Sequence, residues 1–338
     1  MKESNSCLVC GASIIGLRLG VDACRSCALF FKRSRNDTEM TSDCTKGPIA
    51  NSIEASDDDI VIVSPAPDSM HATTSTEESI MDRMGRAYRI CRQRRIENER
   101  CLRKTLSYIN KEVKTACGEV LHLCTNDFLM DSLPMSVTEC INMTNSVFSE
   151  FAALTAVEQH ILIKACAGAQ HYMEMNYFTE KYFPGDDRYQ LVTHTSCFDI
   201  ERMDVYFSIE EPKEGERTVE FYTKKCIEMS RPAIREADLT ETEFYAALCI
   251  IEWNFGHDPS IPPHLLQMGE DMVKRICAQL GRYYKDVLKC DDYALRLGRL
   301  LSLIHSIQET GYVLQEQFQL YKLLGIVKDD DLVMKMLI

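Results

Sequence analysis

Apolar residues recur at helical spacing over much of the chain beyond residue 80. The clearest stretch has apolar side chains at Phe151, Leu154, Ile161, Leu162 and Ala165. Spacings of three, four and seven residues place side chains on one face of a helix, so this stretch predicts an amphipathic helix packed on a core. Thr155 and Glu158 form the S/T-x-x-E pattern of a capping box, which places the start of the helix near Ala156.

Two later stretches carry the same kind of signal. Thr240 and Glu243 form a second capping box before the apolar run FYAALCIIEWNF. The segment YALRLGRLLSLIHSI has an apolar face formed by Leu297, Leu300, Leu301 and Ile304. Leu295 and Leu303 make this helix apolar on nearly every side, so it is either buried in a core or paired with a partner.

Strand signals are few. Residues 197–212 alternate in part between apolar and polar positions, which suits a short hairpin or an irregular segment. Residues 48–80 mix Pro, Ser, Thr and acidic side chains and show no sustained period, which predicts a flexible acidic hinge. The hinge separates a small module over residues 1–47 from a large body over 81–338. The predicted fold class is all-α with a minor strand element.

The net charge of −13 argues against nucleic acid only on average, because the charge is segregated. Residues 48–82 hold eight acidic residues and no Lys or Arg, whereas residues 24–35 hold four basic residues and no acid. The start MKESNSC has no apolar signal region, and no stretch reaches the ~18 apolar residues of a membrane span. We therefore expect an intracellular protein without membrane association, in which the sixteen cysteines stay reduced and metal binding is the first use to consider.

Four cysteines form two CxxC pairs with the spacing C-x2-C-x13-C-x2-C. They are Cys7, Cys10, Cys24 and Cys27. Each pair brings two thiolates to one ion from a tight turn, and two pairs close a tetrahedral site with no open position, so the pattern predicts a structural Zn²⁺ ion. Four unrelated buried thiols are the alternative, at roughly one chance in ten.

The second CxxC pair opens a predicted helix over residues 24–35. At 3.6 residues per turn, Arg25, Leu29, Lys32 and Arg33 share one stripe of it. A short helix fixed by metal that presents Arg and Lys outward is suited to the major groove of DNA, where Arg reads guanine edges and Lys contacts phosphates. A solvated basic helix or a protein-binding zinc module remains open, at about one chance in three.

These residues resemble a known family. The stretch CLVCG...GVDACRSCALFFKRS resembles the first zinc module of the nuclear hormone receptors, especially the expanded nematode type. FSEFAALTAVEQHILIKA, LTETEFYAALCIIEWN and YALRLGRLLSLI are similar to helices of the receptor ligand-binding domain. The resemblance implies a partial zinc-finger DNA-binding module over 1–47, a hinge over 48–80 and a helical-sandwich ligand-binding domain over 81–338. It places the specificity positions at Arg25, Ser26 and Leu29.

The sequence departs from the family pattern after the first zinc module. The second module needs four further cysteines, but only Cys44 precedes the acidic hinge. In the family that module supplies phosphate contacts and a dimer contact, so we expect weakened sequence-specific DNA binding by a single module. The basic segment Arg83 to Lys104 either compensates or is a solvated helix face on which Glu97 and Glu99 pair locally, the commoner explanation.

The C-terminus resembles the receptor switch helix that closes over a ligand and grips a coactivator. The corresponding residues are Leu332, Val333, Lys335, Met336 and Leu337. Lys335 stands where the family has Glu, and Ser146 stands where the family has the partner Lys. Without this charge clamp the groove keeps only apolar attraction, which predicts weak or altered coactivator binding. The alternative is that these residues pack as core and form no mobile switch.

The leading hypothesis is a nuclear receptor-like transcription regulator in the nucleus, with a zinc-dependent DNA-binding module and a domain that responds to a small lipophilic ligand or a partner. The alternative is a receptor-derived protein that no longer reads DNA and pairs with other receptors through Leu297 to Ile304. A Met and aromatic stripe near Tyr172 supplies candidate pocket lining, although such a stripe is more often core, by about three to one. No catalytic motif accompanies the eight histidines, so we expect no enzyme activity.

Overall fold

The computed structural model divides the chain into two units, Met1–Thr76 and Glu77–Ile338. It describes residues 78–105, 111–206, 213–255, 260–290 and 292–323, all of which lie in the second unit. The described part is mostly helical, which confirms the predicted class. No helix within these ranges has both the length and the apolar character needed to cross a bilayer.

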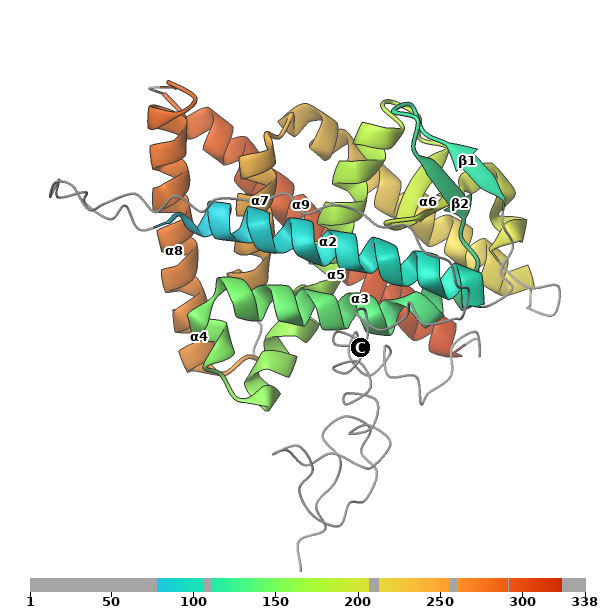
Figure 1. Cartoon of the computed structure of the whole chain (residues 1–338), viewed down its shortest axis with the longest axis horizontal. Helices are drawn as coiled ribbons and strands as arrows, with labels where there is room; N and C mark the ends of the chain where they lie inside the picture. The colour runs from blue at the N-terminus through green and yellow to red at the C-terminus, as the bar shows by residue number, and fades with distance from the viewer. Residues whose placement is uncertain (1–77, 106–110, 207–212, 256–259, 291, 324–338) are drawn as a thin grey trace, which may run out of the picture. The chain divides into compact units, whose positions relative to one another are not determined.

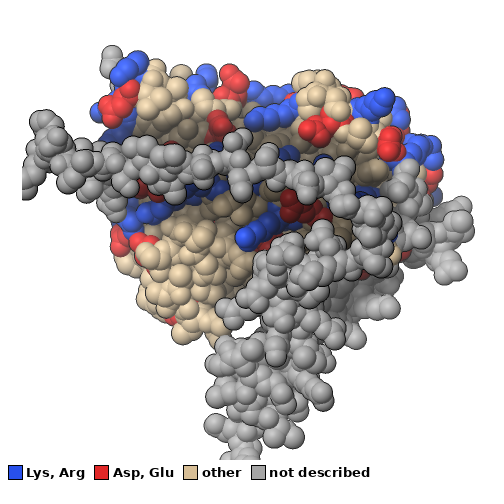
Figure 2. All heavy atoms as spheres, viewed as in Figure 1, with Lys and Arg blue, Asp and Glu red and all other residues tan. Residues whose placement is uncertain are grey.

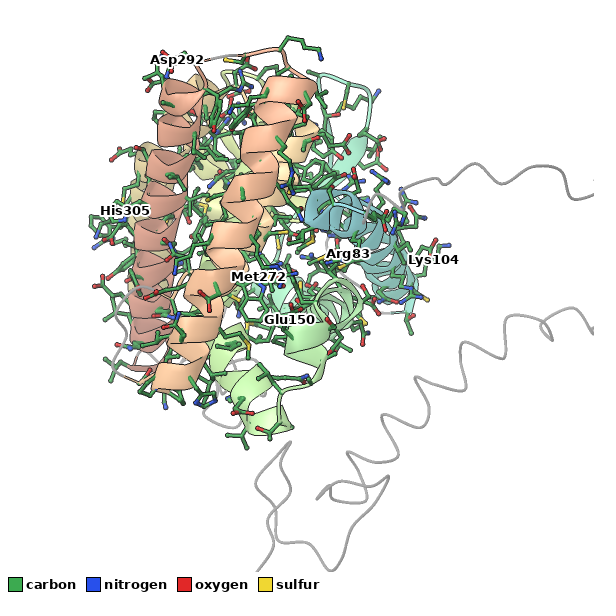
Figure 3. The ribbon with its side chains drawn as sticks, turned by 90° about the vertical axis from the view of Figure 1, so that its left-hand side faces the viewer. Arg83, Lys104, Glu150, Met272, Asp292 and His305 are labelled. Carbon is green, nitrogen blue, oxygen red and sulfur yellow. The ribbon has the colours of Figure 1, made fainter. Side chains whose placement is uncertain are left out.

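The helices stack in layers (Figure 1). α2 (Ile80–Thr105) and α3 (Asn126–Val147) pack together and form the layer nearest the viewer. Behind them α5 (Ala156–Tyr182) packs on α7 (Glu241–Trp253), and α6 (Lys213–Ala237) and α9 (Ala294–Leu323) pack on α5. The short α4 (Ser149–Ala152) follows α3, and α8 (Pro263–Asp286) packs on α7. Figure 3 looks at this arrangement from the side of α8, with Arg83 and Lys104 marking the ends of α2.

Both predicted capping boxes are present. The Thr155 hydroxyl accepts from the Glu158 backbone N–H at 3.3 Å, and the Glu158 carboxylate accepts from the Thr155 N–H at 2.9 Å, so α5 begins at Ala156 as predicted. Thr240 and Glu243 repeat the arrangement at α7. Every residue of α7 from Glu243 to Trp253 is buried, so this helix is the centre of the main core.

A small four-stranded sheet covers one end of the helices. β1 (Glu112–Lys114) and β2 (Val120–Leu123) are antiparallel, β2 runs parallel to β4 (Ser196–Asp199), and β3 (Tyr189–Thr193) is antiparallel to β4, which gives the order β1-β2-β4-β3. The predicted strand element near residue 197 is therefore β4. It continues into a 3₁₀ helix, η2 (Ile200–Val205).

One buried carboxylate joins the sheet to α2. The Glu99 side chain, 2% exposed, accepts hydrogen bonds from the Thr193 hydroxyl at 2.7 Å and from the Thr195 N–H and hydroxyl at 2.8 and 2.6 Å. Since a buried carboxylate needs such donors, Glu99 fixes the β3–β4 turn against the helix. Local pairing of Glu99 on α2 was therefore the wrong expectation, whereas Glu97 does accept from Gln93, one turn away, at 2.7 Å.

Candidate functional site

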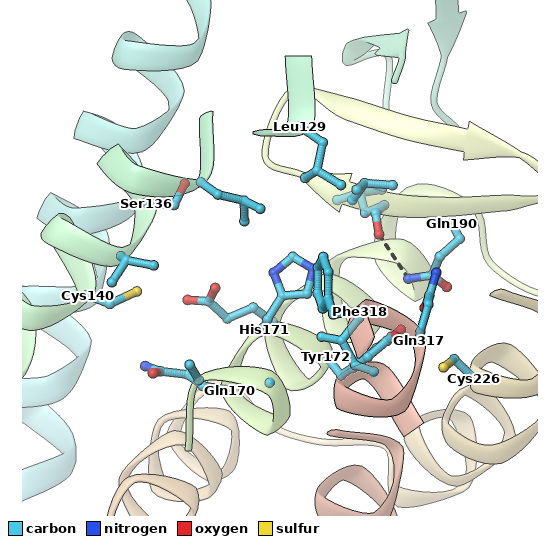
Figure 4. A pocket seen from close by; sticks show the side chains of 18 of the residues that line it. Leu129, Ser136, Cys140, Gln170, His171, Tyr172, Gln190, Cys226, Gln317 and Phe318 are labelled. Atoms are coloured by element: carbon cyan, nitrogen blue, oxygen red, sulfur yellow. Dashed lines mark hydrogen bonds between the residues drawn. The ribbon is translucent and has the colours of Figure 1, made fainter. Parts of the chain in front are cut away.

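An internal cavity of about 110 Å³ lies between α3, α5, the sheet, α6 and α9 (Figure 4). Its walls are largely apolar and come from segments far apart in the sequence. The apolar walls include Leu129, Leu133, Val137, Ile163, Val192 and Phe318. An enclosed apolar space with a few polar groups is the usual form of a small-molecule site.

His171 of α5 supplies the central polar group. Its ring stands among the lining side chains beside Phe318, and the side chain is half-buried (Figure 4). Burial, and after it the charge of Arg95, lower the pKa of His171 to about 4, so the imidazole is neutral at physiological pH. A neutral imidazole offers one N–H donor and one acceptor nitrogen, and no described protein group hydrogen-bonds to either.

The only charges at the cavity wall neutralise each other. Arg95 of α2 and Glu174 of α5 are 5% and 1% exposed, and one guanidinium nitrogen donates to both carboxylate oxygens at 2.9 and 3.1 Å. The same nitrogen lies 3.6 Å from the Cys140 sulfur. Because the guanidinium and the carboxylate pair with each other, this end of the cavity is polar but carries no net charge.

The remaining polar lining groups are also uncharged. Burial raises the pKa of the Cys226 thiol to about 11, and the hydrogen bond with Cys91 raises that of Cys140, so both are thiols at neutral pH. The Gln190 amide donates to the Leu191 carbonyl at 3.1 Å. The Gln170 amide nitrogen, in contrast, is buried without a hydrogen-bond partner, so Gln170 and His171 together provide unused hydrogen-bonding groups.

The Met and aromatic stripe was expected to be core, and most of it is. Met173, Met175 and Tyr177 are buried at 0%, 0% and 6% exposure within apolar clusters. Tyr172 alone of the stripe lines the cavity. The residues that sequence reasoning missed are Gln170 and His171, polar positions just before the stripe within the same predicted helix.

The structure separates the four residues expected to form a dimer face. Leu300 and Ile304 are each 1% exposed in the main core, and Leu297 packs partly against it. Only Leu301, at 40%, is accessible to a partner. The apolar face of α9 therefore turns inward because α9 packs on α5, α6 and α7, and a joint role of all four side chains in a dimer contact was the wrong expectation.

The remaining predicted sites lie outside the described residues. This applies to the zinc ligands Cys7, Cys10, Cys24 and Cys27, to the predicted DNA-reading helix and to the C-terminal switch residues. Within the described ranges no group of His, Cys, Asp or Glu is arranged to hold a metal. The four thiols of the two CxxC pairs are nevertheless the donor set that a structural Zn²⁺ ion takes.

Two family models match the chain. Residues 115–324 match "Ligand-binding domain of nuclear hormone receptor", and this match contains the whole cavity apart from Arg95. Residues 5–51 match "Double treble clef zinc finger, C4 type". The two matches confirm the predicted resemblance, the zinc finger and the helical ligand-binding fold.

Two relatives from Caenorhabditis elegans are similar over nearly the whole chain. Nuclear hormone receptor family member nhr-42 is 20% identical over 93% of this chain and 92% of its own length. Nuclear hormone receptor family member nhr-86 is 21% identical over 96% of this chain and 92% of its own length. Both alignments therefore include at least part of the zinc-finger segment together with the helical segment.

Proposed function

The chain belongs to the nuclear hormone receptor family and is a zinc-binding transcription regulator. We propose that it reads DNA in the nucleus with a single zinc module, and that a small lipophilic ligand binds in the cavity. The proposed parts are a DNA-binding module over 1–47, a hinge over 48–80 and the ligand-binding domain over 81–338. The observation that carries the ligand-binding role is the largely apolar cavity with His171 in its lining, since no described group hydrogen-bonds to that ring.

We assign the zinc ion to Cys7, Cys10, Cys24 and Cys27. The segment matched by the zinc-finger family contains one further cysteine, Cys44, and the next in the chain is Cys91 in α2. A second four-cysteine module has too few ligands here. The proposed DNA contacts are those of the first module, Arg25, Ser26, Leu29, Lys32 and Arg33. With fewer phosphate contacts, binding is weaker and depends less steeply on salt.

The cavity limits the class of ligand. Its volume of about 110 Å³ is below the roughly 300–1,000 Å³ of drug-sized sites, so the ligand is small or expands the cavity on binding. Apolar walls favour an aliphatic or alicyclic body, and the neutral His171 and Gln170 favour one hydroxyl or carbonyl group. Output through a coactivator is weakened because Lys335 and the exposed Ser146 replace the family's charge clamp.

Thermal unfolding of the full-length protein with a panel of short aliphatic alcohols, ketones and carboxylic acids tests the cavity. We expect one class to raise the Tm, since a ligand that binds only the folded state stabilises it. Ala167→Met fills the cavity from its wall and should abolish the shift. Ala294→Met makes the same change at an exposed position of α9 and should retain it.

His171→Leu separates polar recognition from apolar filling. It should weaken binding of the stabilising class about ten-fold, the value of one hydrogen bond in a buried site. Equal shifts in the wild type and in Ala167→Met, or no shift with any class, would contradict ligand binding in this cavity.

A further inference from the structure

The basic segment on α2 is used in two different ways. Four of its arginines face carboxylates, since Arg86, Arg89, Arg94 and Arg95 lie against Glu78, Glu241, Glu139 and Glu174 respectively. Three others, Arg92, Arg100 and Arg103, converge instead on one cleft. Figure 2 shows Lys and Arg side chains along the strip of surface over α2.

This cleft, which we call the arginine cleft, has a volume of about 200 Å³ and is separate from the ligand cavity. For comparison, a cavity of about 10–15 Å³ is enough to hold one water molecule, so the cleft has room for a larger group. It lies between α2, β2, the end of α5 and the β3–β4 turn. Its lining residues are Arg92, Gln93, Ile96, Arg100, Arg103, Glu119, Val120, Leu121, His122, Tyr182, His194 and Thr195.

Positive charge dominates the lining. Arg92 donates to the Tyr182 hydroxyl at 2.8 Å, and its Nε is buried without a partner. No described carboxylate lies within ion-pair distance of Arg92 or Arg100. Arg103 donates to the Ser196 hydroxyl. The single acidic residue in this lining is Glu119, which is exposed, so Arg92 and Arg100 bring positive charge that no described ion pair neutralises.

Two histidines in the cleft keep hydrogen-bonding nitrogens unused. His194 is 3% exposed and both of its ring nitrogens lack a partner, and Nδ1 of His122 lacks one as well. Burial lowers the pKa of both histidines. The charge of Arg103 lowers the pKa of His122 further, and the charges of Arg95 and Arg92 lower the pKa of His194 further. Arg92 and Arg100 therefore give the interior of the cleft a positive potential.

We propose that the arginine cleft binds the phosphate group of a small molecule, as a second site independent of the ligand cavity and of the zinc module. Guanidinium groups match the oxygens of a phosphate with paired N–H donors, and the imidazole nitrogens supply further hydrogen bonds. The depth of His194 favours a single inserted group over the backbone of a duplex, which would contact only the outer arginines. This use of the basic segment differs from both sequence-based alternatives, compensation in DNA binding and a solvated helix face.

Isothermal titration of the full-length protein tests the proposal with three probes: inorganic phosphate, glycerol phosphate, and phosphatidylcholine vesicles with or without phosphatidic acid. Arg100→Gln removes one charge from the cleft at an exposed position, so the fold should be retained, which thermal unfolding checks. Lys104→Gln is the matched control, because it removes one exposed charge from the same helix outside the cleft.

We expect saturable binding that Arg100→Gln weakens about ten-fold or more and Lys104→Gln leaves within two-fold, as one charge-assisted hydrogen bond is worth at least a factor of ten. Binding of inorganic phosphate or glycerol phosphate identifies a soluble phosphate, and binding only to vesicles with phosphatidic acid identifies a lipid headgroup. Absence of binding to all three probes overturns the proposal. Equal weakening by both substitutions overturns it as well.

Discussion

The buried ion pair between Arg95 and Glu174 gives the sharpest test of how the cavity wall is built. The pair joins α2 to α5, and each side chain is at most 5% exposed. Glu174→Gln keeps the shape of the side chain but leaves the guanidinium without a counter-charge. Arg95→Met leaves the carboxylate alone in the same way. Both changes place an unpaired charge where water does not reach it.

The burial sets the expected magnitude. Removing one member of a buried pair costs about 3–5 kcal/mol, whereas replacing both members by apolar side chains is often neutral. We therefore expect each single substitution to lower the free energy of unfolding by about 3–5 kcal/mol. For a unit of this size, 1 kcal/mol moves the Tm by about 2–4 °C, so the Tm falls by roughly 6–20 °C. The double variant Arg95→Met/Glu174→Met should stay within about 1 kcal/mol of the wild type.

Urea unfolding followed by circular dichroism at the helical band measures these differences. Arg94→Met is the control. Arg94 lies on α2 beside Arg95 and pairs with Glu139 of α3, but its side chain is 53% exposed, and an exposed pair is worth less than about 1 kcal/mol. Single substitutions that cost no more than this control, or a double variant that costs the sum of the two singles, would refute the assignment of a closed buried pair.

Three further substitutions follow from the packing of α5, α7 and α9. Desolvation raises the pKa of the buried Glu252 carboxyl to about 8, so the folded state binds this proton more tightly than the unfolded state does. The free energy of unfolding therefore falls as the pH rises from about 5 to 8, by about 1.4 kcal/mol per pH unit. Glu252→Gln should remove this slope, which urea unfolding at several pH values measures. Glu243 caps α7 and also accepts from Arg296 and Tyr284, so Glu243→Ala should cost about 3 kcal/mol or more in the same assay. A Cβ at Gly311 would lie 2.9 Å from the Ala169 nitrogen on α5, so Gly311→Ala should lower the Tm, whereas Gly298→Ala, with no atom within 4 Å, should leave it unchanged or raise it.

The local features of the fold could be predicted from the sequence because they depend on few neighbouring residues. Thr155 and Thr240 carry their capping partners three residues away, so both helix starts followed from the pattern alone. The α9 segment was ambiguous for the opposite reason. Periodicity finds an apolar face but does not say what covers it. Leu300 and Ile304 are buried in the main core, where α9 packs on α5, α6 and α7.

The cavity and the arginine cleft depend on contacts between distant segments. Arg95 and Glu174 are 79 positions apart, and His194 reaches the basic helix only through the β3–β4 turn. In the sequence His171 belongs to an ordinary apolar helix, and its role follows only from the pKa and the space around it. The basic character of α2 was visible in the sequence, but the division of its arginines between ion pairs and the cleft was not.

The central claim is that a single zinc module gives this receptor its DNA reading. Its most direct test is a titration of the zinc-loaded full-length protein against a receptor half-site duplex and a scrambled duplex at two salt concentrations. The account predicts weak but preferential binding to the half-site, lost in Arg33→Ala and kept in Lys46→Ala, which removes one charge outside the predicted reading helix. Equal, salt-sensitive binding to both duplexes, or no binding to either, would contradict it.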